Sequence, residues 1–259
     1  MSEARPSGAH GAHGAHGEAE YTVDVRERGL PKEGVPQFMD RRLFMQLLVF
    51  DVAEEISVDD AQRTLAEAVE ARGVEAVLYA DANAPRGVGL LTWSESPEDF
   101  VERVRPAVNE VPGLKARPAF TMTGRSYSSG FEDDLAFWLL ERPRNTVLNE
   151  AWNWHVWYPL RRNGAFARLE PREQGAVLRE HGTIGKAYGQ ADLAHDIRLA
   201  CHGLDADDNE FLIGLVGKDL HPLSHVVQSM RRTRQTAEFI AKMGPFFVGR
   251  AIWRNVRAG

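Results

Sequence analysis

The second half of the chain, between Trp154 and Gly249, decides the fold. It contains, in chain order, the segments WHVWYPLRR (154–162), EHGTIGKAY (180–188), DNEF (208–211), MRRTRQT (230–236) and GPFFVG (244–249). Apolar runs and helix breakers predict strand, helix, strand, strand, helix and strand over 152–159, a helix opened by Pro171, 196–202, 210–216, a helix from Pro222 to Gly244, and 245–253. This β-α-β-β-α-β order is that of a ferredoxin-like unit.

The first half shows the same order of elements. Ser57 is a good helix N-cap, and Asp59 and Asp60 follow it in the first turn, where acidic side chains are favoured. The predicted elements are strand 43–52, the helix from Ser57 to Gly73, strands 74–80 and 87–93, a helix from Ser96 to 109, and strand 115–123. Two copies of one pattern predict an α+β fold in which two sheets pack together or join into a barrel.

The chain therefore divides into four parts. They are a disordered tail and linker (1–37), a ferredoxin-like half (38–130), a connecting segment (131–150) and a second ferredoxin-like half (151–257). The tail has three copies of Gly-Ala-His and too few apolar residues to offset the entropy of ordering. The connecting segment should contain a helix over 131–140. Pro143 is expected to end that helix.

Composition excludes several classes of function. Hydrophobic residues make up 43% of the 259 residues, charged residues 26%, and the net charge is −6, which argues against a nucleic-acid-binding surface. We see no apolar run long enough to cross a membrane and expect no secretory signal. Cys201 is the only cysteine, so no intrachain disulfide can form. These features predict a cytoplasmic protein.

His181 is the residue with the strongest chemical interest. It lies in an apolar helical stripe with Val177, Ile184 and Tyr188, at spacings of four, three and four. A histidine that faces a pocket is a candidate metal ligand, whereas a core histidine bonded to a carbonyl is the purely structural alternative.

The five segments between Trp154 and Gly249 resemble, in order and spacing, the chlorite dismutase family, and within it the coproheme decarboxylases. The resemblance covers residues 152–250, and the first half fits in its order of elements. It implies a dimeric α+β barrel made of two ferredoxin-like halves, and a homo-oligomer that is commonly a pentamer. It also implies an iron porphyrin in the second half, either haem b or Fe-coproporphyrin III (coproheme).

The resemblance assigns roles to three residues near the iron and the reacting side chain. EHGTIGKAY resembles the helix segment that carries the proximal iron ligand, which implies that role for His181. VWYPLRR resembles the strand whose tyrosine forms the radical that attacks a propionate, which implies that role for Tyr158. Arg162 stands where the family often has a lysine and keeps the positive charge.

MRRTRQT resembles the segment whose arginine and hydroxyl contact propionates. The matching residues are Arg231 and Thr236, and both types suit a carboxylate partner. Gln235 stands where chlorite dismutases have a glutamate that orients the proximal histidine. It could accept a hydrogen bond from the non-ligating ring nitrogen of His181.

The residue on the distal side of the iron is open to three interpretations. Counting back from Gly203 places Asp196 there, where the family has arginine or glutamine. Arg198 lies two residues further along, on the same face of a regular strand, and His195 is the third candidate. An arginine would stabilise an anionic oxygen species, whereas an aspartate could act as a base toward peroxide.

The reaction implied by the resemblance is the peroxide-dependent decarboxylation of Fe-coproporphyrin III to haem b. The protein would then be a haem-dependent oxidoreductase whose partners are the porphyrin and hydrogen peroxide. Chlorite dismutation to chloride and dioxygen is the enzymatic alternative, favoured if Arg198 lies over the iron. A haem-binding protein without catalysis is the other alternative.

Overall fold

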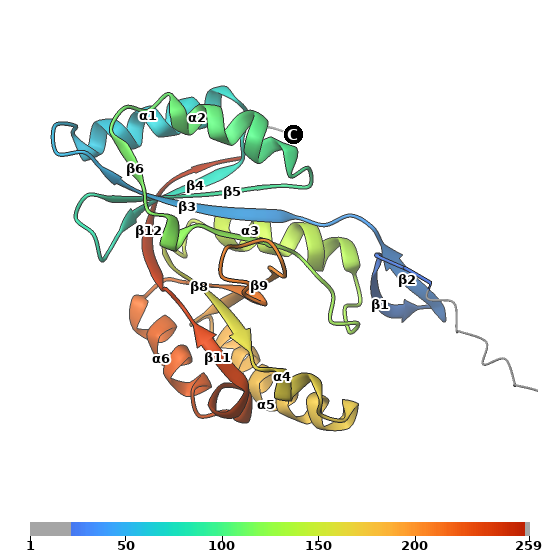
Figure 1. The fold of residues 1–259 in the computed structure, drawn as a ribbon. Helices are drawn as coiled ribbons and strands as arrows, with labels where there is room; N and C mark the ends of the chain where they lie inside the picture. Colours follow the sequence, from blue (N-terminus) through green and yellow to red (C-terminus); the bar gives the residue numbers. More distant parts are fainter. Residues whose placement is uncertain (1–21, 257–259) are drawn as a thin grey trace, which may run out of the picture.

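Eight strands close into a barrel in the computed structural model, which describes residues 22–256 (Figure 1). They are β3 (Phe44–Val52), β4 (Ala76–Asp81), β5 (Gly87–Ser94), β7 (Met122–Arg125), β8 (Trp154–Arg162), β9 (His195–Ala200), β10 (Phe211–Gly217) and β12 (Phe247–Asn255). Neighbouring strands follow the order β7-β3-β5-β4-β12-β8-β10-β9, and β9 returns to β7 through the pair Ala200 and Arg125. All these pairings are antiparallel.

Each half of the barrel has the strand order of a ferredoxin-like unit. In the first half, β7-β3-β5-β4 are the fourth, first, third and second barrel strands of that half, and β12-β8-β10-β9 have the same positions in the second. The halves join where β4 pairs with β12 and where β7 pairs with β9. The predicted α+β barrel of two ferredoxin-like halves is therefore confirmed.

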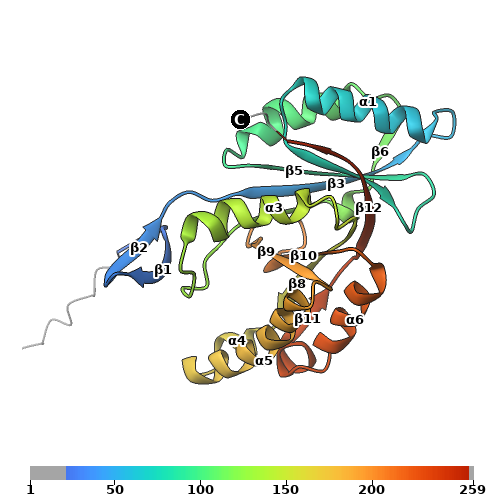
Figure 2. The same cartoon turned by 180° about the vertical axis from the view of Figure 1, so that it is seen from behind.

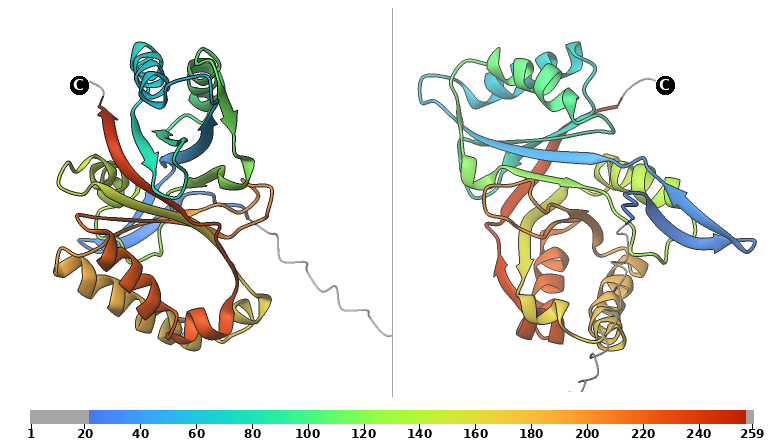
Figure 3. Two further views of the ribbon diagram at one scale, coloured as in Figure 1. Left: turned by 90° about the vertical axis from the view of Figure 1, so that its left-hand side faces the viewer. Right: turned by 45° about the vertical axis from the view of Figure 1, so that its right-hand side comes forward.

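Helices cover the two halves on opposite sides of the barrel (Figures 2 and 3). Those on the first half are α1 (Val58–Ala71) and α2 (Arg105–Asn109). Those on the second are the short α4 (Gly164–Ala167), α5 (Pro171–Gln190) and α6 (Leu220–Met230). Within residues 22–256, no helix combines the length and the apolar character needed to span a bilayer.

The segment expected to be an extended linker contains a β-hairpin. Strands β1 (Glu27–Lys32) and β2 (Val35–Met39) pair antiparallel, away from the barrel (Figure 1). The turn residues Glu33 and Gly34 both have positive φ, 53° and 81°. A two-residue hairpin turn needs this conformation, and Gly34 supplies it without strain. The predicted disordered tail lies outside the described residues.

Two elements of the first half differ from expectation. The strand expected at 115–123 is split into β6 (Leu114–Ala116) and β7 by a 3-10 turn, η2, at Pro118–Phe120. Pro118 cannot donate a hydrogen bond to a neighbouring strand, so the ladder stops there. The helix expected to begin at Ser96 starts as the π-helical turn η1 (Phe100–Val104) and continues into α2.

The helix of the connecting segment was predicted to end at Pro143, but it continues past this residue. A π-helical turn, η3 (Phe137–Glu141), continues directly into α3 (Arg142–Leu148), so Pro143 lies inside the helix. The amide of Arg142 donates to the carbonyl of Phe137, five residues back. This wider turn accommodates a residue that lacks an N–H and would crowd the preceding turn.

The last predicted helix was too long. It ends at Met230 rather than Gly244, and the chain continues through a π-helical turn, η4 (Gln235–Phe239), into β11 (Ile240–Met243), which pairs with β8. The buried hydroxyl of Thr233 donates to the carbonyl of Met230 over 2.8 Å. The same carbonyl accepts from the backbone amide of Thr233 over 3.0 Å, and the two bonds hold the chain in a turn that ends the helix.

The interior of the barrel contains a buried tyrosine–histidine pair. Tyr79 donates its hydroxyl to Nδ1 of His155 over 2.8 Å, and Nε2 of His155 contacts the carbonyl of Trp152 at 3.1 Å. Both side chains are fully buried. Burial, with a smaller contribution from Arg254, lowers the pKa of His155 to about 3, although the bond to Trp152 opposes this. His155 is therefore neutral in the folded protein.

Acidification should destabilise the fold through His155. In the unfolded chain this residue titrates at its ordinary value of 6.5, so between pH 6.5 and 3 the unfolded state binds a proton that the folded state does not. Stability is lost as the pH falls, by about 1.4 kcal/mol per pH unit below 6.5 for this residue. Urea denaturation at pH 7.0 and 5.5 would measure the loss.

The variant His155→Gln separates this effect from other titrating groups, because glutamine can bond to both Tyr79 and Trp152 without binding a proton. We expect its unfolding free energy to depend less on pH than that of the natural protein. Equal slopes for the two proteins would contradict the assignment.

Candidate functional site

One face of the second-half sheet carries several of the predicted site residues. Across the paired strands, Tyr158 lies opposite Ile213, and Ile213 lies opposite Arg198. Two residues along the strands, Leu215 lies opposite Asp196. Asp196 and Arg198 therefore share this face, as regular alternation predicts. Tyr158 packs with side chains of α5 and α6, which shows that this face is turned toward the two helices.

His195 lies on the opposite face of β9 from Asp196. Its ring stacks on Trp152, with 3.6 Å between ring centroids, and its Nε2 contacts Asp192 at 2.9 Å. Of the three candidates for the distal residue, His195 is therefore the one that the fold separates from Tyr158.

Helix α5 is loosely covered by the rest of the described chain. Of its twenty residues only Val177 is buried, although Ile184 and Tyr188 are partly buried against the sheet. His181 lies on the same side of the helix, three residues before Ile184. Burial first, and then Arg198, lower the pKa of His181, while Asp196 opposes them. His181 thus lies within electrostatic reach of the strand β9.

Thr233 holds the ring of His181. Its oxygen lies 3.3 Å from Nδ1 of His181, and its own hydroxyl hydrogen is directed to the carbonyl of Met230. A hydroxyl that donates to Met230 accepts from Nδ1–H of His181, which is the tautomer with an unprotonated Nε2. Nε2 has no hydrogen bond within residues 22–256. This tautomer is the one that a metal bound at Nε2 requires.

The expected hydrogen bond from His181 to Gln235 is not present. Thr233, two residues before Gln235 in the turn that follows α6, is the hydrogen-bond partner of His181 instead. The side-chain oxygen Oε1 of Gln235 is buried and has no hydrogen-bond partner in the described chain. Thr236 lies beside the same group, with its hydroxyl 3.4 Å from that of Thr233. Sequence reasoning missed Thr233, whose hydroxyl falls within the quoted MRRTRQT segment.

Asp196 binds two arginines. Arg142 donates to Oδ1 over 2.9 Å from helix α3, and Nε of Arg198 lies 3.1 Å from Oδ2. Burial would raise the pKa of Asp196, but the charges of Arg142 and then Arg198 outweigh it and lower that pKa. Asp196 is consequently ionised and a weak base. Arg142 was not predicted, because it lies in the connecting segment, 54 positions away.

Tyr158 is buried and stacked on Phe246, with 4.5 Å between ring centroids. Burial, followed by the charge of Asp196, raises the pKa of its phenol, and Arg231 acts in the opposite direction. The phenol is therefore neutral. Arg231 is exposed, and its guanidinium has no ion pair or hydrogen bond among the described residues.

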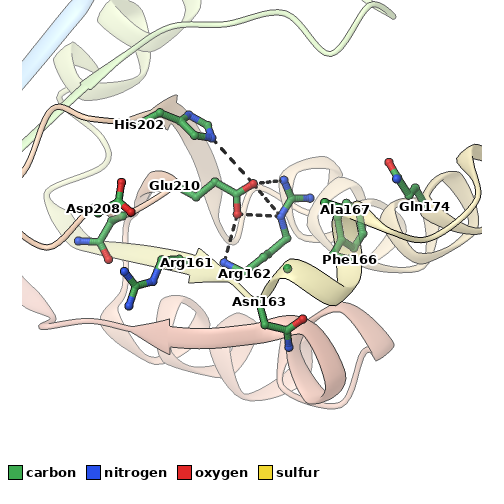
Figure 4. Close-up of a pocket in the computed structure, with 11 residues that line it drawn as sticks. Arg161, Arg162, Asn163, Phe166, Ala167, Gln174, His202, Asp208 and Glu210 are labelled. Carbon is green, nitrogen blue, oxygen red and sulfur yellow. Dashed lines mark hydrogen bonds and ion pairs between the residues drawn. The ribbon is translucent and has the colours of Figure 1, made fainter.

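Arg162 is paired, not free. It lies in a pocket of about 510 Å³, shown in Figure 4, with its guanidinium bound to the carboxylate of Glu210. Nε of Arg162 lies 2.9 Å from Oε2 of Glu210, and Nη2 contacts Oε1. Other residues that line the pocket are Arg161, Asn163, Phe166, Gln174, His202 and Asp208.

Comparison with known proteins identifies the family and supports the fold. The family model of chlorite dismutase matches residues 97–252. Among solved structures, the chain is similar to a haem-binding protein from Thermus thermophilus, at a TM-score of 0.64 and 17% identity over 82% of this chain and 92% of that one. It is also similar to the chlorite dismutase of Candidatus Nitrospira defluvii in complex with imidazole, at a TM-score of 0.62 and 12% identity over 83% and 92%.

No curated protein matches the chain significantly in sequence. The similar structures establish the fold, and the family model covers more than half of the chain, including β8 to β10, α5 and α6. This protein belongs to the chlorite dismutase family.

Proposed function

We propose that the protein binds an iron porphyrin of the haem type between helix α5 and the β8-β10-β9 face, with His181 as the iron ligand. The observation that carries this proposal is the contact of Nδ1 with Thr233, which favours the tautomer with an unprotonated Nε2, an atom without a hydrogen bond in the described residues. Haem iron is commonly held by one neutral histidine whose other nitrogen donates to a fixed acceptor.

The surrounding residues fit a ligand with carboxylate groups. Arg231 is exposed and unpaired among the described residues. The hydroxyl of Thr236 lies 3.4 Å from that of Thr233, which contacts His181. The buried oxygen of Gln235 has no partner among the described residues. Helix α5 has a single buried residue, Val177, so a flat apolar ligand would cover inner side chains such as Ile184 and Tyr188, which are only partly buried.

The reaction we propose is the decarboxylation of Fe-coproporphyrin III to haem b with hydrogen peroxide. Each propionate, with one peroxide and one proton, yields a vinyl group, carbon dioxide and two waters. The bound iron would pass the oxidising equivalents of peroxide to the site. Tyr158, buried and neutral on the same sheet face, would take the hydrogen atom from the propionate side chain. Arg231 and Thr236 would hold carboxylates away from the reacting edge.

Chlorite dismutation is the second candidate, and Arg198 favours it. The side chain of Arg198 is 52% exposed on the face that carries Tyr158, and it lowers the pKa of His181. A guanidinium in this place could bind a small oxyanion. Its pairing with Asp196 lowers the net positive charge and weakens that argument.

Replacing Tyr158 should stop decarboxylation without preventing binding. We expect Tyr158→Phe to lower the rate of carbon dioxide release by about 100-fold or more, a barrier increase of about 2.7 kcal/mol. Stepwise peroxide addition to the ferric coproheme complex, followed by mass spectrometry of the porphyrin, measures this rate. Tyr188→Phe is the matched control. The hydroxyl of Tyr188 bonds to His225 and Ser229 between α5 and α6, so its loss should not affect the reaction. Conversion by Tyr158→Phe at the natural rate would exclude the tyrosine.

The role of Arg198 can be tested with the haem b complex. If decarboxylation is the function, dioxygen release from chlorite should stay near the rate of free haem, and Arg198→Leu should change it little. Rapid dioxygen release by the natural protein, lost in Arg198→Leu, would instead establish chlorite dismutation. Binding without turnover of either oxidant would indicate a haem-binding protein.

Thr233 should control how His181 binds iron. Thr233→Val keeps the shape of the side chain but leaves the N–H of Nδ1 without an acceptor, which costs about 1–3 kcal/mol. We expect ferric coproheme to bind at least about tenfold more weakly, and the iron–histidine stretching band in the ferrous Raman spectrum to shift. Thr233→Ser keeps the hydroxyl and should behave like the natural protein. A His181→Ala protein with an unchanged porphyrin spectrum would overturn the ligand assignment itself.

A further inference from the structure

Glu210 binds one edge of the Arg162 guanidinium, formed by Nε and Nη2. Nε of Arg162 lies 3.1 and 2.9 Å from the two oxygens of Glu210, and the backbone amide of Arg162 donates to Oε2 over 3.1 Å. The guanidinium also lies over the rings of Phe166 and Phe211, 4.1 and 4.9 Å from their centroids. The side chains of Arg162 and Glu210 are only 15% and 20% exposed. The surroundings of Arg162 are thus shaped for a carboxylate.

This carboxylate site is built on the same strand as Tyr158 and reaches the same helix as His181. Tyr158 and Arg162 share one face of β8 and are four residues apart, which corresponds to about 13 Å along a strand. Gln174, which lines the pocket, precedes His181 by seven residues of α5, or about 10 Å. Gln174 thus brings α5 to the pocket, and a carboxylate that extends along this face of β8 from Tyr158 would reach Arg162.

We propose that Glu210 stands in for a substrate carboxylate and competes with it for Arg162. The inference rests on the proposed function: a propionate of coproheme displaces Glu210, and Glu210 returns when that propionate leaves as carbon dioxide. The exchange keeps Arg162 paired in both states, which avoids the cost of an unpaired charge in a half-covered pocket. Because the substrate must displace Glu210, the competition weakens binding of the tetracarboxylate. A product that has lost the propionate at Arg162 does not meet this competition.

The experiment uses iron-free porphyrins, so that binding does not depend on the iron ligand. Quenching of porphyrin fluorescence gives the Kd of coproporphyrin III, which has four propionates, and of protoporphyrin IX, which has two. In Glu210→Gln we expect the Kd of coproporphyrin III to fall about tenfold, and that of protoporphyrin IX to change less than about twofold. The ratio of the two constants therefore shifts about tenfold in favour of the tetracarboxylate.

Asp208→Asn is the matched control. Asp208 lines the same pocket and, within residues 22–256, has no bond to Arg162, so the variant removes an equal charge without freeing the arginine. We expect its ratio of constants to equal that of the natural protein. A similar shift in both variants would mean that general charge, not exchange at Arg162, sets the preference, and would overturn the proposal.

Glu210→Asp keeps the charge but shortens the side chain, and it covers the case in which Glu210→Gln does not fold. It should shift the ratio in the same direction as Glu210→Gln, and circular dichroism establishes that each variant is folded. An unchanged ratio in the folded variants overturns the role of Glu210 while leaving porphyrin binding intact. A natural protein that binds neither porphyrin nor ferric coproheme overturns the proposed function as well.

Discussion

The arrangement of the site depends on the register of β8. This strand pairs with β10 on one side and with β12 and β11 on the other, so each side chain is assigned to one of two surroundings. Trp157 faces the barrel core, while its neighbour Tyr158 faces the helices. A shift of one residue would exchange them. Gly214 pins the register, because a Cβ at that position would lie 2.6 Å from the ring of Trp157.

The sequence predicted the order of elements well, because that order follows from apolar periodicity and helix breakers, which are local properties. It failed where a local signal was overridden by a less regular backbone. Pro143 was expected to end a helix, but a π-helical turn before it removes the conflict. Gly244 was expected to stop a helix that Thr233 already ends, through a bond between a side chain and the carbonyl of Met230. Neither device has a periodic signature.

The site was partly predictable for the same reason. Asp196 and Arg198 were expected to share a face, which follows from strand alternation alone. The partners of these residues were not foreseen, since Arg142 and Glu210 come from segments 54 and 48 positions away from the groups they bind. Pairing at such separations depends on how the two halves and their loops pack, and no local pattern encodes it.

The predicted arginines differ in how freely they can accept an anion. Arg231 is unpaired in the described chain, Arg162 is bound by one carboxylate, and Arg198 shares Asp196 with Arg142. An anion gains most at Arg231, where no ion pair has to be broken. At Arg162 it must exchange with a carboxylate of similar geometry, so the exchange is nearly balanced in free energy. A carboxylate that is to be removed is better held at a balanced position than at a strong one, because tight binding of the ground state raises the barrier to its loss. Under the proposed function, this ordering assigns the stable contacts of a polycarboxylate to Arg231 and its reacting arm to Arg162, four residues from Tyr158 on the same face of β8.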